Sequence, residues 1–175
     1  DPELFIWAGY DADAIPMLAQ AREIGFEPPL YVGAPPGWPA DFGKNPLSNG
    51  VILYGMWAPA LKEVNEPAKN FWNAYITKYD EKPATYFAPL GYTNIKYLAK
   101  GIRKAGTLEK DKLIKSLKNI TYDSPIGTTL KMKPSNTIQN QGFTRQKILQ
   151  YQDGNQEVIW PFNVSTSEIE YPFSW

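Results

Sequence analysis

One stretch of the sequence, Leu4 to Trp38, constrains the fold more than any other, because it reads as strand, loop, helix, strand and second loop. It opens with Leu4 to Ala8, an unbroken apolar run of strand length that ends at Gly9. Such a run predicts a strand that is buried on both faces. A second strand is expected at Leu30 to Val32, so the stretch predicts a βαβ unit and an α/β fold.

The segment between these two strands predicts a helix that ends at Gly25, a natural left-handed stop. Asp11 and Asp13 are alternative N-caps of this helix. Pro16 is expected in its first turn, where the missing N–H has no hydrogen bond to lose.

A candidate ligand site lies where the two strands end. Ligands of open α/β sheets bind beyond the carboxyl ends of the strands. Tyr10 directly follows the first strand, and the loop after the second strand contains Pro35, Pro36 and Trp38. A tyrosine in this place can both stack on a small molecule and hydrogen-bond to it. The alternative is a turn residue that packs on Pro36 or Trp38, and the sequence leaves both open.

The middle of the chain reads as helical after a third strand at Val51 to Tyr54. Asn65 is the candidate cap of one helix. The longest helix is expected from about Tyr86 to Gly106, with an apolar stripe that includes Ile95 and Leu98.

The chain returns to strands near its end. Gly127 to Met132 alternates weakly, which indicates one strand. Lys147 to Tyr151 and Glu157 to Trp160 flank Asp153-Gly154, a dipeptide that strongly favours a hairpin turn.

Three segments resemble one known family. The segment AGYDADAIPMLAQAREIGFEPPLYVG is similar to the second half of the solute-binding proteins of ABC transporters in the branched-chain amino acid (Leu/Ile/Val-binding) family. The segment KPATYFAPLGYTNIKYLAKGIRKAG resembles that family's penultimate long helix, and QYQDGNQEVIWPFNVSTSEIEYPFSW resembles its end. The matches stand in the right order and cover essentially all 175 residues. The resemblance implies the type I periplasmic binding protein fold, with Rossmann-like lobes of parallel sheet flanked by helices.

The resemblance also implies how the chain is divided. By position, residues 1–55 and 143–175 correspond to the second lobe, and residues 56–142 are a helical portion of the first lobe. The two crossings between lobes would lie near Tyr54 to Pro59 and Gln141 to Phe143. The N-terminal lobe would lie upstream and be missing from this chain, which starts with Asp1-Pro2 and looks like a fragment. The implied function is extracytoplasmic capture of an amino acid or similar solute for a membrane permease.

The resemblance also implies which residues contact the ligand, because two positions of this chain match ligand contacts of the family. Tyr10 matches the residue from which the family's second lobe offers an aromatic hydroxyl to the ligand. Phe87, beside Tyr86, matches an aromatic contact from the first lobe, although a Phe at a helix start can equally be a core residue.

The loop at 34–38 departs from the family, because amino acid binders carry an acidic residue there and this chain has Pro35 or Pro36. A buried ammonium without a countercharge is strongly unfavourable. Either Asp11 or Asp13 supplies that charge, or the ligand is a carboxylate or amide that lacks an amine.

Composition weighs against other functions. Lys+Arg and Asp+Glu both number 18, so a zero formal charge gives no field that would attract nucleic acid. Cysteine and histidine are absent, which removes disulfides, the commonest metal ligands and the commonest general base. With no Gly-x-Ser-x-Gly elbow or Gly-rich phosphate loop either, we expect no enzyme, cofactor or metal. The alternative function is a ligand-sensing domain of a receptor or regulator with the same fold.

Overall fold

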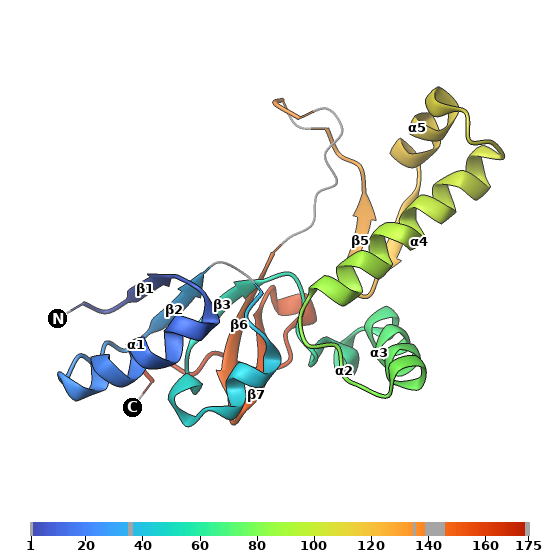
Figure 1. Ribbon diagram of the computed structural model, residues 1–175. Helices are drawn as coiled ribbons and strands as arrows, with labels where there is room; N and C mark the ends of the chain where they lie inside the picture. Colours follow the sequence, from blue (N-terminus) through green and yellow to red (C-terminus); the bar gives the residue numbers. More distant parts are fainter. Residues whose placement is uncertain (1, 35–36, 135, 139–145, 174–175) are drawn as a thin grey trace.

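The computed structural model of this chain describes residues 2–34, 37–134, 136–138 and 146–173. Strands and helices alternate in the first third, helices dominate the middle, and strands return at the end (Figure 1). The elements in chain order are β1 (Phe5–Ala8), α1 (Asp11–Glu23), β2 (Tyr31–Ala34), β3 (Ile52–Gly55), α2 (Leu61–Val64), α3 (Glu66–Tyr79), α4 (Phe87–Ala105), α5 (Lys110–Lys118), β4 (Thr121–Ser124), β5 (Thr128–Lys131), β6 (Lys147–Gln152) and β7 (Asn155–Trp160).

Five of the strands form one mixed sheet in the order β1-β2-β3-β6-β7. The first three run parallel, and β6 and β7 are antiparallel to their neighbours. The predicted α/β class with a parallel βαβ unit is therefore confirmed. The sheet joins strands from the two ends of the chain, because Leu53 of β3 lies opposite Leu149 of β6.

The main core lies between this sheet and α1. Ala14 and Leu18 of the helix belong to one buried cluster with strand residues that include Leu53 and Val158. Near the C-terminal end of α1, the Phe5 and Phe26 rings meet edge to face with centroids 5.3 Å apart. These contacts hold α1 against one face of the sheet.

Two predictions about the βαβ unit are wrong. The strand β1 is not buried on both faces, because Leu4 and Ile6 expose 45% and 60% of their surface. It is an edge strand, and α1 covers only one face of the sheet. The N-cap of α1 is Tyr10 rather than either aspartate, so the helix begins earlier than expected and Pro16 lies inside it.

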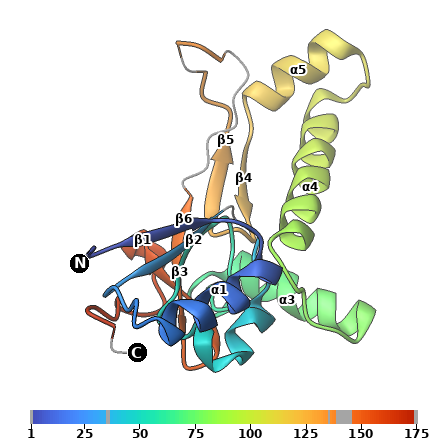
Figure 2. The ribbon, with the colours of Figure 1, turned by 60° about the vertical axis from the view of Figure 1, so that its left-hand side comes forward.

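The middle of the chain forms a second part that projects from the sheet (Figures 1 and 2). As predicted, the Asn65 side chain caps α3 by accepting from the Ala68 N–H, and α4 ends at Gly106 with φ +65°. A two-stranded sheet of β4 and β5 stands beside α4. The strand β4 was not predicted, because its sequence Thr-Tyr-Asp-Ser has no apolar alternation.

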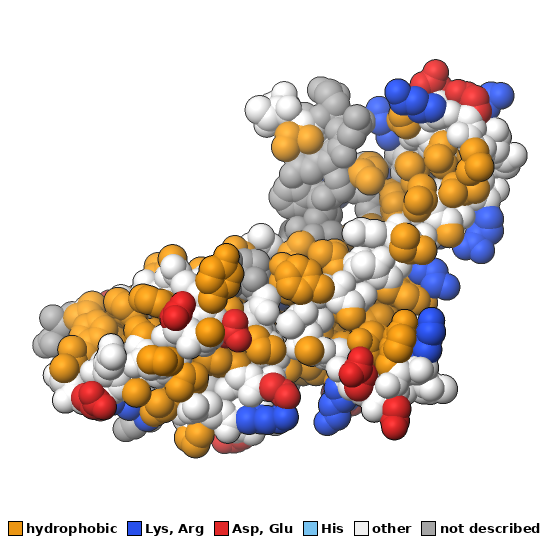
Figure 3. All heavy atoms as spheres, in the orientation of Figure 1, with side chains coloured by type: hydrophobic (Ala, Val, Ile, Leu, Met, Phe, Trp, Pro, Cys, Tyr) orange, Lys and Arg blue, Asp and Glu red, His pale blue; other side chains and the backbone are white. Residues whose placement is uncertain are grey.

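The apolar stripe predicted on α4 is present in the helix, but it is not its buried face. Ile95 and Leu98 are 67% and 41% exposed, and hydrophobic side chains lie at the surface along this helix (Figure 3). The buried face carries Tyr97, whose hydroxyl donates to the Leu117 carbonyl at 2.8 Å, and Gly101, whose carbonyl accepts from Ser116. None of the described helices is long and apolar enough to cross a bilayer.

The C-terminal residues fold back along the sheet. The predicted hairpin between β6 and β7 is confirmed, and its turn residues Asp153 and Gly154 both have positive φ. The tail after β7 is held by buried glutamines, since Gln150 Nε2 donates to the Glu170 carbonyl at 3.1 Å. The second predicted crossing, Gln141 to Phe143, lies outside the described residues.

Candidate functional site

Tyr10 stands at the carboxyl end of β1, as the sequence predicts. Its extended backbone, with ψ 159°, makes it the N-cap of α1. Its carbonyl accepts from the Asp13 N–H at 3.1 Å, while its side chain makes no capping bond. The ring is 72% exposed and is therefore free to contact a ligand.

The two aspartates near Tyr10 occupy the first turn of α1. Negative charge there interacts favourably with the helix dipole. Burial raises the pKa of the Tyr151 hydroxyl far above its ordinary value, and the negative charge of Asp11 adds to that rise.

The loop after β2 contains a buried tryptophan, Trp38. Pro35 and Pro36 lie outside the described residues. Trp38 is only 4% exposed, and its Nε1 donates to the Gly9 carbonyl at 3.2 Å. Its ring lies against Gly33, where an added Cβ would come within 2.5 Å of the indole. Trp38 therefore ties the loop to the end of β1 and leaves little of its own surface for a ligand.

The start of α4 lies against the same loop. Tyr86 is the N-cap of α4 and Phe87 its first residue, and their ring centroids are 4.4 Å apart. A Cβ added to Gly37 would lie 3.1 Å from Tyr86 Cε1 and 3.8 Å from Phe87 Cε2. The Ala40 N–H also donates to the Ala84 carbonyl at 3.2 Å, which holds the two segments together.

These contacts link the segments that carry four aromatic residues far apart in the sequence. We refer to Tyr10, Trp38, Tyr86 and Phe87 as the tip cluster. Trp38 bonds to Gly9, the neighbour of Tyr10, and the Tyr86–Phe87 pair flanks Gly37, the neighbour of Trp38. Phe87 is 63% exposed, so the cluster presents aromatic surface from both parts of the chain.

Sequence reasoning did not predict two buried polar side chains, those of Trp7 and Lys147. The Trp7 ring lies over Gly9, and its buried Nε1 has no hydrogen-bond partner. Lys147 is a lysine buried to 1% exposure at the start of β6. A lysine that starts a strand normally faces solvent, so no sequence signal could have found it. In the part of the chain that the structure describes, no three His, Cys, Asp or Glu side chains could hold a metal ion together.

Comparisons with known proteins agree on one family. A family model described as "Periplasmic binding protein" matches residues 1–154. Among curated proteins, the Leu/Ile/Val-binding protein homolog 8 of Brucella abortus is 24% identical over 97% of this chain and 43% of its own length. The chain thus spans less than half the length of this relative.

Solved structures with the same fold include two ABC transporter proteins. A putative branched-chain amino acid ABC transporter from Rhodospirillum rubrum has a TM-score of 0.71 and 23% identity, over 90% of this chain and 44% of that one. The solute binding protein of an ABC transporter from Rhodopseudomonas palustris BisB5, in complex with 3,4-dihydroxy benzoic acid, has a TM-score of 0.66 and 21% identity, over 89% and 43%. Both show the type I periplasmic binding protein fold for this chain.

Proposed function

This chain belongs to the periplasmic binding protein family, and we propose that it is part of the extracytoplasmic solute-binding component of an ABC importer. In this role it holds a small solute between two lobes and hands it to a membrane permease. Residues 1–55 and 143–175 belong to one lobe and residues 56–142 to the other. The exposed apolar stripe of α4 supports this division, because that stripe needs a covering surface that the described residues do not supply.

The observation that carries the proposal is the contact of Tyr86 and Phe87 with Gly37. It brings the first turn of α4 against the carboxyl ends of β1 and β2, where α/β folds bind their ligands. Tyr10 and Phe87 then contact the solute from the two lobes, and Trp38 fixes the loop between them. Aromatic burial with a few directed hydrogen bonds is the usual anatomy of a small-ligand site.

The solute is an amino acid or a related small carboxylate or amide. Pro35 and Pro36 stand where amino acid binders carry an acid, so a ligand ammonium needs Asp11 or Asp13 as its countercharge. Both aspartates lie in the first turn of α1, where their charge already interacts favourably with the helix dipole. This favours a ligand without an amine, and a relative of the same fold is described in complex with 3,4-dihydroxy benzoic acid.

A thermal-shift titration of the full-length protein tests this proposal. The panel contains leucine and valine, benzoate and 3,4-dihydroxybenzoate, and benzamide. A ligand that binds only the folded form raises the melting temperature by mass action. A shift with the acids alone supports a ligand without an amine, and a shift with leucine or valine means that another group replaces the missing acid. No shift with any member of the panel contradicts the proposed solute class.

The second candidate function is a sensory domain of a receptor or regulator with the same fold. The exposed aromatic surface of the tip cluster would serve a sensor equally well. Deleting the gene of this protein separates the two, since loss of an importer component abolishes uptake of the solute, whereas loss of a sensor leaves uptake unchanged and abolishes the cellular response to the solute.

A further inference from the structure

The loop that follows β2 lies against the β6–β7 hairpin, which comes from the other end of the described chain (Figure 1). Gly43 approaches the hairpin turn so closely that an added Cβ would come within 2.6 Å of the Gly154 carbonyl oxygen. The Phe42 ring contacts both the Trp38 ring and the Tyr151 ring, with centroids 4.9 and 5.1 Å away. The hairpin therefore supports this loop along its length.

Two buried side chains of the hairpin hydrogen-bond to the main chain of the loop. Tyr151 of β6 is completely buried and donates its hydroxyl to the Pro39 carbonyl at 3.0 Å. Gln156 of β7, its cross-strand neighbour, is 6% exposed. The Gln156 Nε2 donates to the Tyr151 hydroxyl at 3.0 Å and to the Trp38 carbonyl at 3.4 Å. The phenol and the amide thus form one unit that binds two consecutive carbonyls of the loop.

A buried polar unit of this kind fixes one geometry. Burying a phenol and an amide is unfavourable unless their hydrogen bonds are made, so the unit holds the loop only in the arrangement that makes them. Burial also raises the pKa of the Tyr151 hydroxyl, which therefore remains a donor. The loop held in this way bonds to Gly9 through the Trp38 indole and packs on Tyr86 through Gly37.

We propose that Tyr151 and Gln156 are positioning residues of the solute site. Both are buried, so they act on a solute only through the loop that links the Tyr10 and Phe87 segments. This inference rests on the proposed function, because the solute would bind beside that loop. A site whose supporting groups are loosely held binds more weakly even when every contact residue is present.

Two substitutions remove these hydrogen bonds with little change in shape. Tyr151→Phe keeps the ring and loses the hydroxyl, and Gln156→Met keeps the chain length and loses the amide. Each has a matched control that loses a hydrogen bond of an equally buried side chain to the main chain elsewhere. Tyr97→Phe does so in the helical part, at a residue that is 7% exposed. Gln152→Met does so at the C-terminal tail, at a residue that is 6% exposed.

Two measurements on the full-length protein separate positioning from stability. Isothermal titration with the best ligand of the panel, at a temperature at which all variants are folded, gives the dissociation constant. Fluorine NMR of protein labelled with fluorotryptophan reports the surroundings of Trp38, whose signal is identified by its absence in Trp38→Phe. Because this signal needs no ligand, it tests the hold on the loop independently of solute binding.

We expect a dissociation constant raised about three- to ten-fold in Tyr151→Phe and Gln156→Met, with a shifted or broadened Trp38 signal. The double variant should bind about as weakly as either single variant, since the two side chains act as one unit. Both controls should lose stability but keep the affinity and the Trp38 signal of the wild type.

The positioning role is overturned if Tyr151→Phe and Gln156→Met have the Trp38 signal of their controls, or bind the ligand as tightly as the controls do. Should Gln156→Met not fold, the comparison of Tyr151→Phe with Tyr97→Phe decides.

This outcome is separable from the proposed function. Solute binding that is equally tight in the wild type and all variants supports the importer proposal and overturns the positioning role. A Trp38 signal that changes in both variants, without binding of any panel ligand, supports the hold on the loop and contradicts the proposed solute class.

Discussion

The aromatic side chains at the proposed solute site differ in how much of their surface is exposed. Tyr10 and Phe87 expose large aromatic surfaces, whereas Trp38 is buried and holds the loop through one hydrogen bond. Under the proposed function, Tyr10 and Phe87 contact the ligand, and Trp38 holds the loop in place. We therefore expect substitutions of Tyr10 and Phe87 to change the affinity for the solute, and substitutions of Trp38 to change the stability of the protein.

The substitution Trp38→Phe tests whether Trp38 holds the loop through its hydrogen bond to Gly9. Phenylalanine keeps an aromatic ring but leaves the Gly9 carbonyl without the indole donor at 3.2 Å. Losing this partly buried hydrogen bond costs about 0.5–1.5 kcal/mol of the free energy of unfolding. Urea unfolding of the full-length protein measures this loss. Trp160→Phe is the control, since that side chain is 38% exposed, and an equal loss in the two variants contradicts the assigned role.

The buried Lys147 predicts how stability depends on pH. Its pKa is about 8 in the folded chain against an ordinary value of 10.5. Between these values the unfolded state holds the proton that the folded state has lost, so stability rises with pH. The rise is on the order of 3 kcal/mol over this window and is absent below it.

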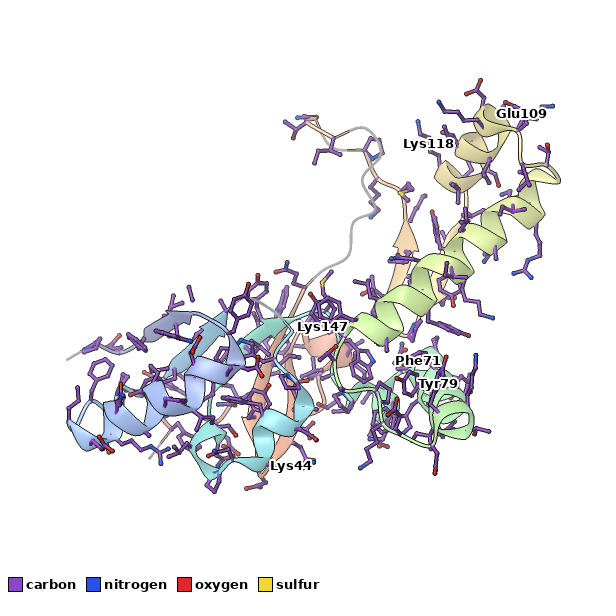
Figure 4. The ribbon with its side chains drawn as sticks, in the orientation of Figure 1. Lys44, Phe71, Tyr79, Glu109, Lys118 and Lys147 are labelled. Atoms are coloured by element: carbon purple, nitrogen blue, oxygen red, sulfur yellow. The ribbon has the colours of Figure 1, made fainter. Side chains whose placement is uncertain are left out.

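Lys147→Met removes the titrating group and so flattens this rise. Urea unfolding at pH 7 to 10.5 in chloride buffer, compared with Lys118→Met, which replaces an exposed lysine of α5 (Figure 4), measures the difference between the two curves. If the Lys147→Met and Lys118→Met proteins gain stability with pH in parallel, titration of Lys147 does not cause the rise.

The sequence could predict that Tyr10 follows a strand and that Phe87 starts a helix, because both places follow from local patterns. Their role as ligand contacts stays a prediction. It could not predict Trp7 or Lys147. Their burial depends on which segment folds over them, for example the Gly127 turn over Lys147, and periodicity within one strand carries no such information.

At the scale of elements, local signals predicted some of the boundaries of helices and turns, and tertiary contacts determined which faces are buried. The Asn65 cap and the Asp153-Gly154 turn were predicted because each is a local hydrogen-bonding or backbone requirement. The stripe of Ile95 and Leu98 was predicted as apolar but is exposed, because α5 and the β4–β5 sheet cover the opposite face.

The C-terminal tail is an element held by side-chain bonds. Gln150 Nε2 donates to the carbonyls of Gly50 and Glu170, and its Oε1 accepts from the Glu170 N–H. Gln150→Ala leaves these buried groups unpaired, and we expect a loss of about 2–3 kcal/mol of unfolding free energy. The tail should also become sensitive to protease. Limited proteolysis with mass spectrometry checks this, and the exposed Gln20→Ala is the control. A tail that resists cleavage equally in both variants contradicts the role of Gln150.

At the scale of the whole molecule, the described chain has apolar surface that it does not cover. It lies on β1 and along α4. The parallel strands also have one face only partly covered, although sheets of this class are normally covered on both. The proposed lobe division accounts for the α4 surface, because residues 56–142 would then pack against the rest of the first lobe.

Ile95→Lys tests that division. If α4 is covered in the full-length protein, burying a lysine in place of isoleucine there costs about 2 kcal/mol or more. Ile24→Lys is the control, since Ile24 is 80% exposed at the end of α1. Chemical unfolding of the two full-length variants measures the difference. Equal stabilities would mean that α4 stays exposed and would refute the assignment of residues 56–142.

The central claim is that Tyr10 and Phe87 face one solute from two parts of the molecule. Isothermal titration of the full-length protein with its best panel ligand tests it most directly, comparing Phe87→Ala with Tyr79→Ala, an aromatic that is 52% exposed at the end of α3 (Figure 4). Losing one stacked ring predicts a dissociation constant raised about ten-fold in Phe87→Ala and unchanged in Tyr79→Ala. A Phe87→Ala protein that binds as tightly as the wild type would contradict the claim.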